Sequence, residues 1–134
     1  MLRVVIIDGI AMSRNLLGTI LTNGGHEVVG DSNTSAAGVA RMIKLRPQIV
    51  CIDIGHEEDG GMALLDTVRG ELPKALVFMV SGKMNPENVQ GALQRGVHGF
   101  IVKPFNAETV LTAIRNAILK LARQQKIKTE GANP

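Results

Sequence analysis

Four polar residues that could take part in chemistry each close a short apolar run of the sequence. They are Asp8, Asp53, Ser81 and Lys103. Runs that are apolar at every position are typical of strands buried on both faces, as in a parallel sheet covered by helices. The carboxyl ends of such strands form the edge at which open α/β folds place their ligands. If the four runs share one sheet, two carboxylates, a hydroxyl and an ammonium group meet there.

This set of side chains fits phosphoryl transfer to a carboxylate. A carboxylate attacks phosphorus poorly because two anions must approach each other, so the site needs positive charge and fixed hydrogen-bond donors. A divalent ion held by oxygen ligands, a lysine and a hydroxyl would provide both. For any one of the four residues alone, a simple turn is the competing interpretation, since Asp is common in turns. Four such residues at equivalent strand ends are a stronger signal.

The spacing of apolar residues predicts the elements that position these side chains. We expect strands at 2–7, 26–32, 49–53, 75–80 and 100–102, separated by helices, with a last helix from 107 to about 124. This alternation predicts an α/β fold with a doubly wound, five-stranded parallel sheet and helices on both faces. Right-handed crossovers leave few topologies, of which the flavodoxin-like strand order 2-1-3-4-5 is the common one for five strands.

Length and composition predict one domain. The chain has 134 residues without Trp or Tyr, so we expect an aliphatic core in a domain at 1–124, followed by a polar, disordered tail at 125–134. Cys51 has no partner for an internal disulfide and is expected to be a buried small hydrophobe. Neither a signal peptide nor a membrane span is expected, and a cytoplasmic location is the prediction.

The remaining charged and titratable residues give weaker signals. Basic residues gather near the end of the chain, at Lys120, Arg123, Lys126 and Lys128. No aromatic residues are interleaved with them, so a solvated helix end is expected and direct nucleic-acid binding is not. The three histidines have no metal-ligand spacing and are expected in surface or turn positions: His26, His56 and His98.

The chain resembles the receiver domain of two-component response regulators, of the CheY-like single-domain type, from residue 2 to about residue 122. The most specific piece is the segment Gly-Phe-Ile-Val-Lys-Pro-Phe at 99–105, supported by Ser81-Gly82 and by the glycine pair at 60–61. The resemblance implies that Asp53 is the phosphoacceptor, with Ser81 and Lys103 as its hydroxyl and lysine partners. It also implies a switch role for Phe100 and Ser81, and a cis peptide bond before Pro104.

The resemblance further implies a Mg²⁺ ion held by Asp8, Asp53 and the backbone carbonyl of Gly55. Receivers usually carry two acids after the first strand, whereas here Gly9 stands in the second position. We therefore expect weak Mg²⁺ binding. Acids of the loop could compensate in part, although a solvated loop is the simpler interpretation: Glu57, Glu58 and Asp59. His56-Glu57 also replaces the Met-Pro pair that the family usually has in this loop.

The implied function is to accept a phosphoryl group from a sensor histidine kinase or a phosphotransfer protein. Signalling would follow through altered protein contacts at the face formed by the fourth helix, fifth strand and fifth helix, with a downstream target or a second copy of the chain. Leu111 and Leu119 widen the apolar surface of that last helix. The protein would not be an enzyme beyond its own phosphorylation and dephosphorylation.

Two alternatives remain open. Gly9 supports a pseudo-receiver, which binds partners without phosphoryl transfer. An enzyme of similar fold is less well supported. A flavodoxin needs a hydroxyl-rich phosphate loop and aromatic side chains around the flavin, and a haloacid-dehalogenase-type phosphatase needs a second Asp where Ile10 stands.

Overall fold

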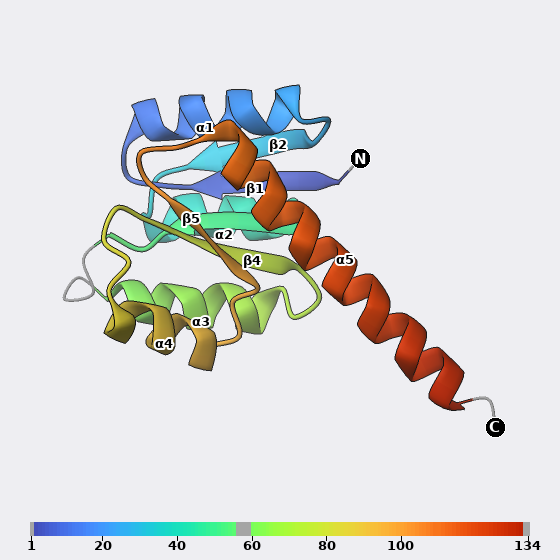
Figure 1. The fold of residues 1–134 in the computed structure, drawn as a ribbon. Coiled ribbons are helices and arrows are strands. Elements are labelled where there is room, and N and C mark those ends of the chain that lie inside the picture. Colours follow the sequence, from blue (N-terminus) through green and yellow to red (C-terminus); the bar gives the residue numbers. More distant parts are fainter. Residues whose placement is uncertain (1, 56–59, 133–134) are drawn as a thin grey trace.

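The computed structural model of the protein describes residues 2–55 and 60–132, with side chains up to Lys126. Five parallel strands form one sheet in the order β2-β1-β3-β4-β5. The strands are β1 (Arg3–Ile7), β2 (Glu27–Ser32), β3 (Ile49–Asp53), β4 (Leu76–Ser81) and β5 (Gly99–Val102). The predicted fold class and strand order are therefore confirmed (Figure 1).

In the described residues, five helices cover both faces of the sheet. They are α1 (Ala11–Asn23), α2 (Ala36–Lys44), α3 (Gly61–Glu71), α4 (Pro86–Gln94) and α5 (Ala107–Ala132). Successive strand residues point to opposite faces, so each central strand contributes side chains to two hydrophobic cores, one on each face of the sheet. On one face Val50 and Ile52 pack with side chains of α2, α3 and α4. On the other face Ile49 and Cys51 pack with side chains of α1 and α5. Burial on both faces explains the unbroken apolar runs.

Local signals set the helix ends. Ser35 accepts a hydrogen bond from the N–H of Gly38 at the start of α2, and Asn85 accepts one from Asn88 before Pro86 opens α4. Gly24 ends α1, where its backbone N–H donates to the carbonyl of Ile20. No helix in the described part of the chain is long and apolar enough to cross a membrane.

The last helix is longer than the sequence predicted. α5 continues to Ala132, so its predicted end near residue 124 is wrong. The predicted disorder of the tail at 125–134 stays a prediction. The residues beyond 124 are rich in Gln, Lys and Glu, which favour helix without needing an apolar face to pack. Figure 1 shows this part of α5 projecting beyond the sheet.

Candidate functional site

The carboxyl ends of four strands bring the predicted residues to one edge of the sheet. Ile7, just before Asp8, pairs with Ile52, just before Asp53. Asp53 in turn pairs with Val80 of β4, and Ser81 pairs with Val102 of β5. The strand ends are therefore level with one another, and parallel pairing converts four separate sequence positions into a single site.

Lys103 joins the two carboxylates. Its Nζ lies 2.9 Å from Oδ2 of Asp8 and 2.6 Å from Oδ2 of Asp53. The Asp8 side chain is only 4% exposed and that of Asp53 14%, so these contacts are only weakly screened by solvent. Burial by itself would lower the pKa of Lys103, but the hydrogen bonds and negative charges of Asp53 and Asp8 outweigh it and raise that pKa. The lysine is therefore a fixed cation, and the three groups together carry one net negative charge.

The other oxygen of each carboxylate is held by the backbone. Oδ1 of Asp8 accepts a hydrogen bond from the N–H of Ile10 at 2.9 Å, and Oδ1 of Asp53 accepts one from the N–H of Gly55 at 2.8 Å. Gly55 has a φ of 68°, in the left-handed region that glycine tolerates best. Each carboxylate is thus oriented from two sides before any ligand arrives.

Arg14 is a further residue at this edge, and the sequence analysis missed it. Its guanidinium donates to the backbone carbonyl of Asp8 at 2.7 Å and pairs with Asp31 at 3.0 Å, which ties α1 to the ends of β1 and β2. The signal in the sequence is its place on the first turns of the helix that follows Asp8. An arginine on an otherwise solvated helix does not reveal such a contact until strand order is known.

Ser81 and Phe100 lie beside the charged group. Ser81 is 9% exposed, and its Oγ accepts the N–H of Lys83 at 2.9 Å. The hydroxyl proton of Ser81 is left to donate to another acceptor. Phe100 is half-buried and packs against the core beneath α2, α3 and α4. The peptide bond between Lys103 and Pro104 is cis, as the resemblance implied.

A cleft of about 540 Å³ opens above the two acids, and its lining includes Gly9, Gly55 and Thr34. The donor set fits a small hard cation, because the carboxylates of Asp8 and Asp53 already converge on one cation, the Lys103 ammonium. No cluster of three His, Cys, Asp or Glu side chains suited to a metal exists in the described part of the chain. Gly55 contacts Asp53 through its N–H, and its predicted carbonyl ligation stays a prediction.

Gly9 leaves space at the cleft. Within residues 2–55 and 60–126, no side chain or distant backbone atom lies within 4 Å of where a Cβ would stand. Packing therefore leaves room for an acidic side chain at position 9. The acids of the loop proposed to compensate for it, residues 57–59, lie outside the described residues.

The sequence profile of the response regulator receiver domain matches residues 4–115 of this chain. The chain is 33% identical over 116 residues to the chemotaxis protein CheY of Bacillus subtilis, covering 87% of this chain and 97% of that protein. It is 32% identical over 117 residues to CheY of Listeria monocytogenes, covering 87% and 98% of the two chains. The chain therefore belongs to the response regulator receiver family, and within it to the CheY-like receivers of two-component signalling.

Solved structures agree on the fold. NtrX of Brucella abortus matches with a TM-score of 0.80 and 29% identity, over 95% of this chain and 29% of that one. A CheY of Vibrio cholerae matches with a TM-score of 0.76 and 24% identity, over 87% and 98% of the two chains.

Receiver domains as a family interact with histidine kinases or phosphotransfer proteins, typically bind Mg²⁺ and are generally non-enzymatic. A methylesterase of Archaeoglobus fulgidus is also similar, but this chain covers only 34% of its length.

Proposed function

We propose that the protein accepts a phosphoryl group on Asp53 from a sensor histidine kinase or a phosphotransfer protein. The observation that carries this proposal is the contact of Lys103 with both Asp8 and Asp53 at the carboxyl edge of the sheet. A fixed cation beside a nearly buried carboxylate reduces the repulsion that otherwise keeps two anions apart.

In the proposed transfer, a carboxylate oxygen of Asp53 attacks the phosphorus of a phosphohistidine. A P–O bond forms while the P–N bond breaks, and the imidazole leaving group keeps the electron pair and takes up a proton. Lys103 then pairs with a phosphoryl oxygen, and the Ser81 hydroxyl donates to another while its oxygen still accepts from Lys83. The absence of a side chain at Gly82 leaves the phosphoryl group room to approach.

Asp8, Asp53 and the Gly55 carbonyl would hold Mg²⁺. The ion would supply positive charge to the phosphoryl oxygens when bound. Because Gly9 stands in place of an acid, this site should bind Mg²⁺ more weakly than a site with three carboxylates would. The second candidate is a pseudo-receiver that binds partners without phosphoryl transfer, and Gly9 is the observation that favours it.

Two surfaces are proposed for protein partners. Ile10, just before α1, is exposed and lines the cleft, and together with the exposed Met12 and Leu16 of α1 it would contact the phosphodonor protein. The face made by α4, β5 and α5 would contact the downstream target or a second copy. Val102 and Leu119 are exposed there, and Phe100 can swing deeper if Ser81 moves toward the phosphoryl group.

The proposal is tested by intact-mass measurement after incubation with acetyl phosphate and Mg²⁺. The wild-type chain should gain one acid-labile phosphoryl group, and Asp53→Asn should gain none while keeping its circular dichroism spectrum. A wild-type chain that gains no phosphoryl group would favour the pseudo-receiver. A gain that persists in Asp53→Asn would refute the role of Asp53.

A further inference from the structure

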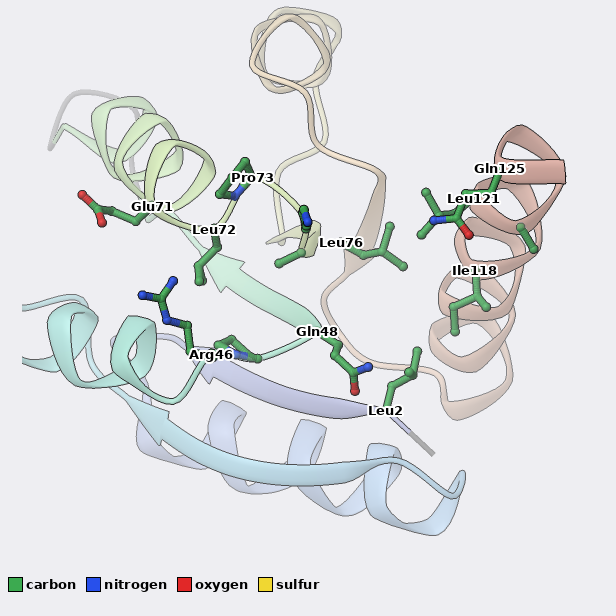
Figure 2. A pocket seen from close by; sticks show the side chains of 14 residues that line it. Leu2, Arg46, Gln48, Glu71, Leu72, Pro73, Leu76, Ile118, Leu121 and Gln125 are labelled. Atoms are coloured by element: carbon green, nitrogen blue, oxygen red, sulfur yellow. The ribbon is translucent and has the colours of Figure 1, made fainter. Parts of the chain in front are cut away.

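A second cavity lies at the opposite edge of the sheet from Asp53. It measures about 690 Å³ and is bounded by the amino ends of β3 and β4, by the end of α3 and by α5 between residues 118 and 125. Figure 2 shows Leu72 and Leu76 on one side of this groove and Ile118 and Leu121 of α5 on the other. We refer to it below as the basal groove.

The wall formed by α5 has the pattern of a helix-packing surface. Four residues of α5 line the groove: Ile118, Leu121, Ala122 and Gln125. Their spacing of i, i+3, i+4 and i+7 gives one stripe along the helix, and such a stripe is what one helix presents to another. Ile118 and Leu121 are only half-buried by the protein's own core. The stripe therefore has apolar surface left for a second helix.

The opposite rim carries more positive than negative charge. Arg46 and Lys74 line the groove together with one acid, Glu71, and all three are exposed. None of them belongs to an ion pair among the described residues. α5 itself adds further basic residues, including Lys120 and Arg123. The α5 of a second copy would bring like charges to this rim, so the charges disfavour self-association there.

Arg46 is held in a conformation that would suit glycine better. Its φ is 50°, in the left-handed region that residues with a side chain rarely adopt. The guanidinium of Arg3 fixes the turn by donating to the carbonyl oxygens of Leu45 at 2.5 Å and Arg46 at 2.9 Å. The fold thus tolerates strain at the residue that places a cation on the rim.

We propose that the basal groove binds an amphipathic helix with an acidic outer face, contributed by a partner protein. Its apolar side would pack on the stripe of α5 and on Leu72, and its acids would meet Arg46 and Lys74. The contact lies at the sheet edge away from Asp53, so a phosphoryl group on Asp53 leaves it unchanged. The partner helix would therefore stay bound to the protein whether or not Asp53 is phosphorylated.

The test uses a fluorescent peptide of about 18 residues, long enough to form a helix, with Leu at i, i+3, i+4 and i+7 and Glu on the other face. Anisotropy should report binding to the full chain. A matched peptide with Lys in place of Glu should bind about fivefold or more weakly, because it meets two cations. Beryllofluoride should not change the affinity. Equal binding of both peptides, or no binding of the Glu peptide, would overturn the proposal.

Variants on the two walls of the groove distinguish a loss of binding caused by charge from one caused by unfolding. Arg46→Gly should weaken binding of the Glu peptide about two- to fivefold, as expected for one partly solvated charge, while the unfolding midpoint stays equal or rises. Glu71→Gln should tighten binding. Ala122→Glu, exposed within the stripe, should weaken binding about tenfold, whereas its control Asn116→Glu lies outside the groove lining and should not.

A small amphipathic anion is the competing occupant. Dodecanoate titrated by NMR should shift signals of the groove weakly or not at all. The helix proposal would be wrong, and the groove would be a site for a small anion, if two results were found together. Dodecanoate would bind saturably in the wild type and not in Arg46→Gly, and Ala122→Glu would not change binding of the peptide.

Discussion

At the residue scale, three side chains set the charge of the site. Lys103 contacts Asp8 and Asp53 directly, and backbone N–H groups hold the remaining carboxylate oxygens. Gly9 stands where the resemblance led us to expect a second acid, and the space above it is open among the described residues. Adding a carboxylate there should therefore change electrostatics without repacking the fold.

The first prediction concerns Gly9→Asp, which should tighten Mg²⁺ binding. A third carboxylate beside a divalent ion should contribute about 1–4 kcal/mol, with a screened Coulomb energy as the upper range. Each 1.4 kcal/mol is roughly tenfold in affinity. NMR titration of the apo protein with Mg²⁺ measures the effect, and Gly9→Asn is the uncharged control. Equal affinities in the wild type and Gly9→Asp would contradict the electrostatic account.

Much of this site could be predicted from sequence because its residues end apolar strands. Asp8, Asp53 and Lys103 were found in this way, and the structure brings them into contact. Arg14 was not found, because its contacts with Asp8 and Asp31 depend on how α1 lies over β1 and β2. His98 is exposed, as expected for a surface or turn position, but its contact with Val77 of β4 could be known only from the sheet register.

At the scale of elements, the junction of β4 and β5 depends on a side chain. The backbone N–H of His98 donates to the carbonyl oxygen of Val77 at 2.7 Å. The imidazole Nδ1 of His98 accepts the backbone N–H of Val77 at 3.0 Å. The imidazole thus takes the place of a backbone acceptor at the start of the strand pair. Burial lowers the pKa of His98, and the charges of Arg69 and Lys120 lower it further.

The second prediction is that His98 makes stability depend on pH. In the unfolded chain its pKa is about 6.5, above the folded value, so the unfolded state takes up the proton first. The contribution of His98 is complete above about pH 6.5 and is lost as the pH falls toward the lowered folded pKa. Urea unfolding at about pH 7.5 and about pH 5.5 should show a smaller loss for His98→Gln than for the wild type.

His26 titrates in the same direction, because burial and the N-terminal charge lower its pKa. It is unchanged in His98→Gln, so the comparison isolates His98. An equal loss of stability on acidification in both proteins would assign the pH dependence to other groups.

The third prediction concerns two glycines of α3 in very different surroundings. A Cβ at Gly61 would overlap the carbonyl oxygen of Ile54, while a Cβ at Gly70 would meet open space. Gly61→Ala should destabilise the protein by roughly 1–3 kcal/mol, because the helix must shift away from β3. Gly70→Ala should stabilise it by about 0.5–1 kcal/mol through the helix preference of alanine.

Chemical denaturation measures both changes. Gly61→Ala should also disturb the cleft, since Ile54 and Gly61 both line it. If Gly61→Ala were as stable as Gly70→Ala, the close approach of α3 to the end of β3 would not be a constraint.

The elements themselves were largely predictable, and the exceptions have one physical cause. The two fully apolar runs at 49–52 and 75–80 became the buried strands β3 and β4. The described helices alternate with the strands along the chain, as predicted. α5 was predicted too short because an apolar period reports packing, whereas a solvated helix needs only favourable propensity.

At the scale of the whole molecule, the sheet separates two surfaces of different character. The carboxyl edge holds the charged group around Asp53, and the amino edge holds the basal groove beside Arg46 and Lys74. Phe100 belongs to β5, whose Val102 pairs with Ser81 at the carboxyl edge, and under the proposed function it would respond to a phosphoryl group there. If the protein acts as proposed, phosphorylation of Asp53 would change the surface at the carboxyl edge, while the basal groove would keep its partner.

The central claim is that Asp53 is the residue that carries the phosphoryl group. The most direct measurement is to phosphorylate the chain with acetyl phosphate and Mg²⁺, reduce the acyl phosphate with borohydride, and locate the resulting homoserine by tandem mass spectrometry. The account predicts homoserine at position 53 alone, with a yield that falls in Lys103→Gln because the fixed cation is lost. Homoserine at position 8, or at neither position after a confirmed mass gain, would contradict it.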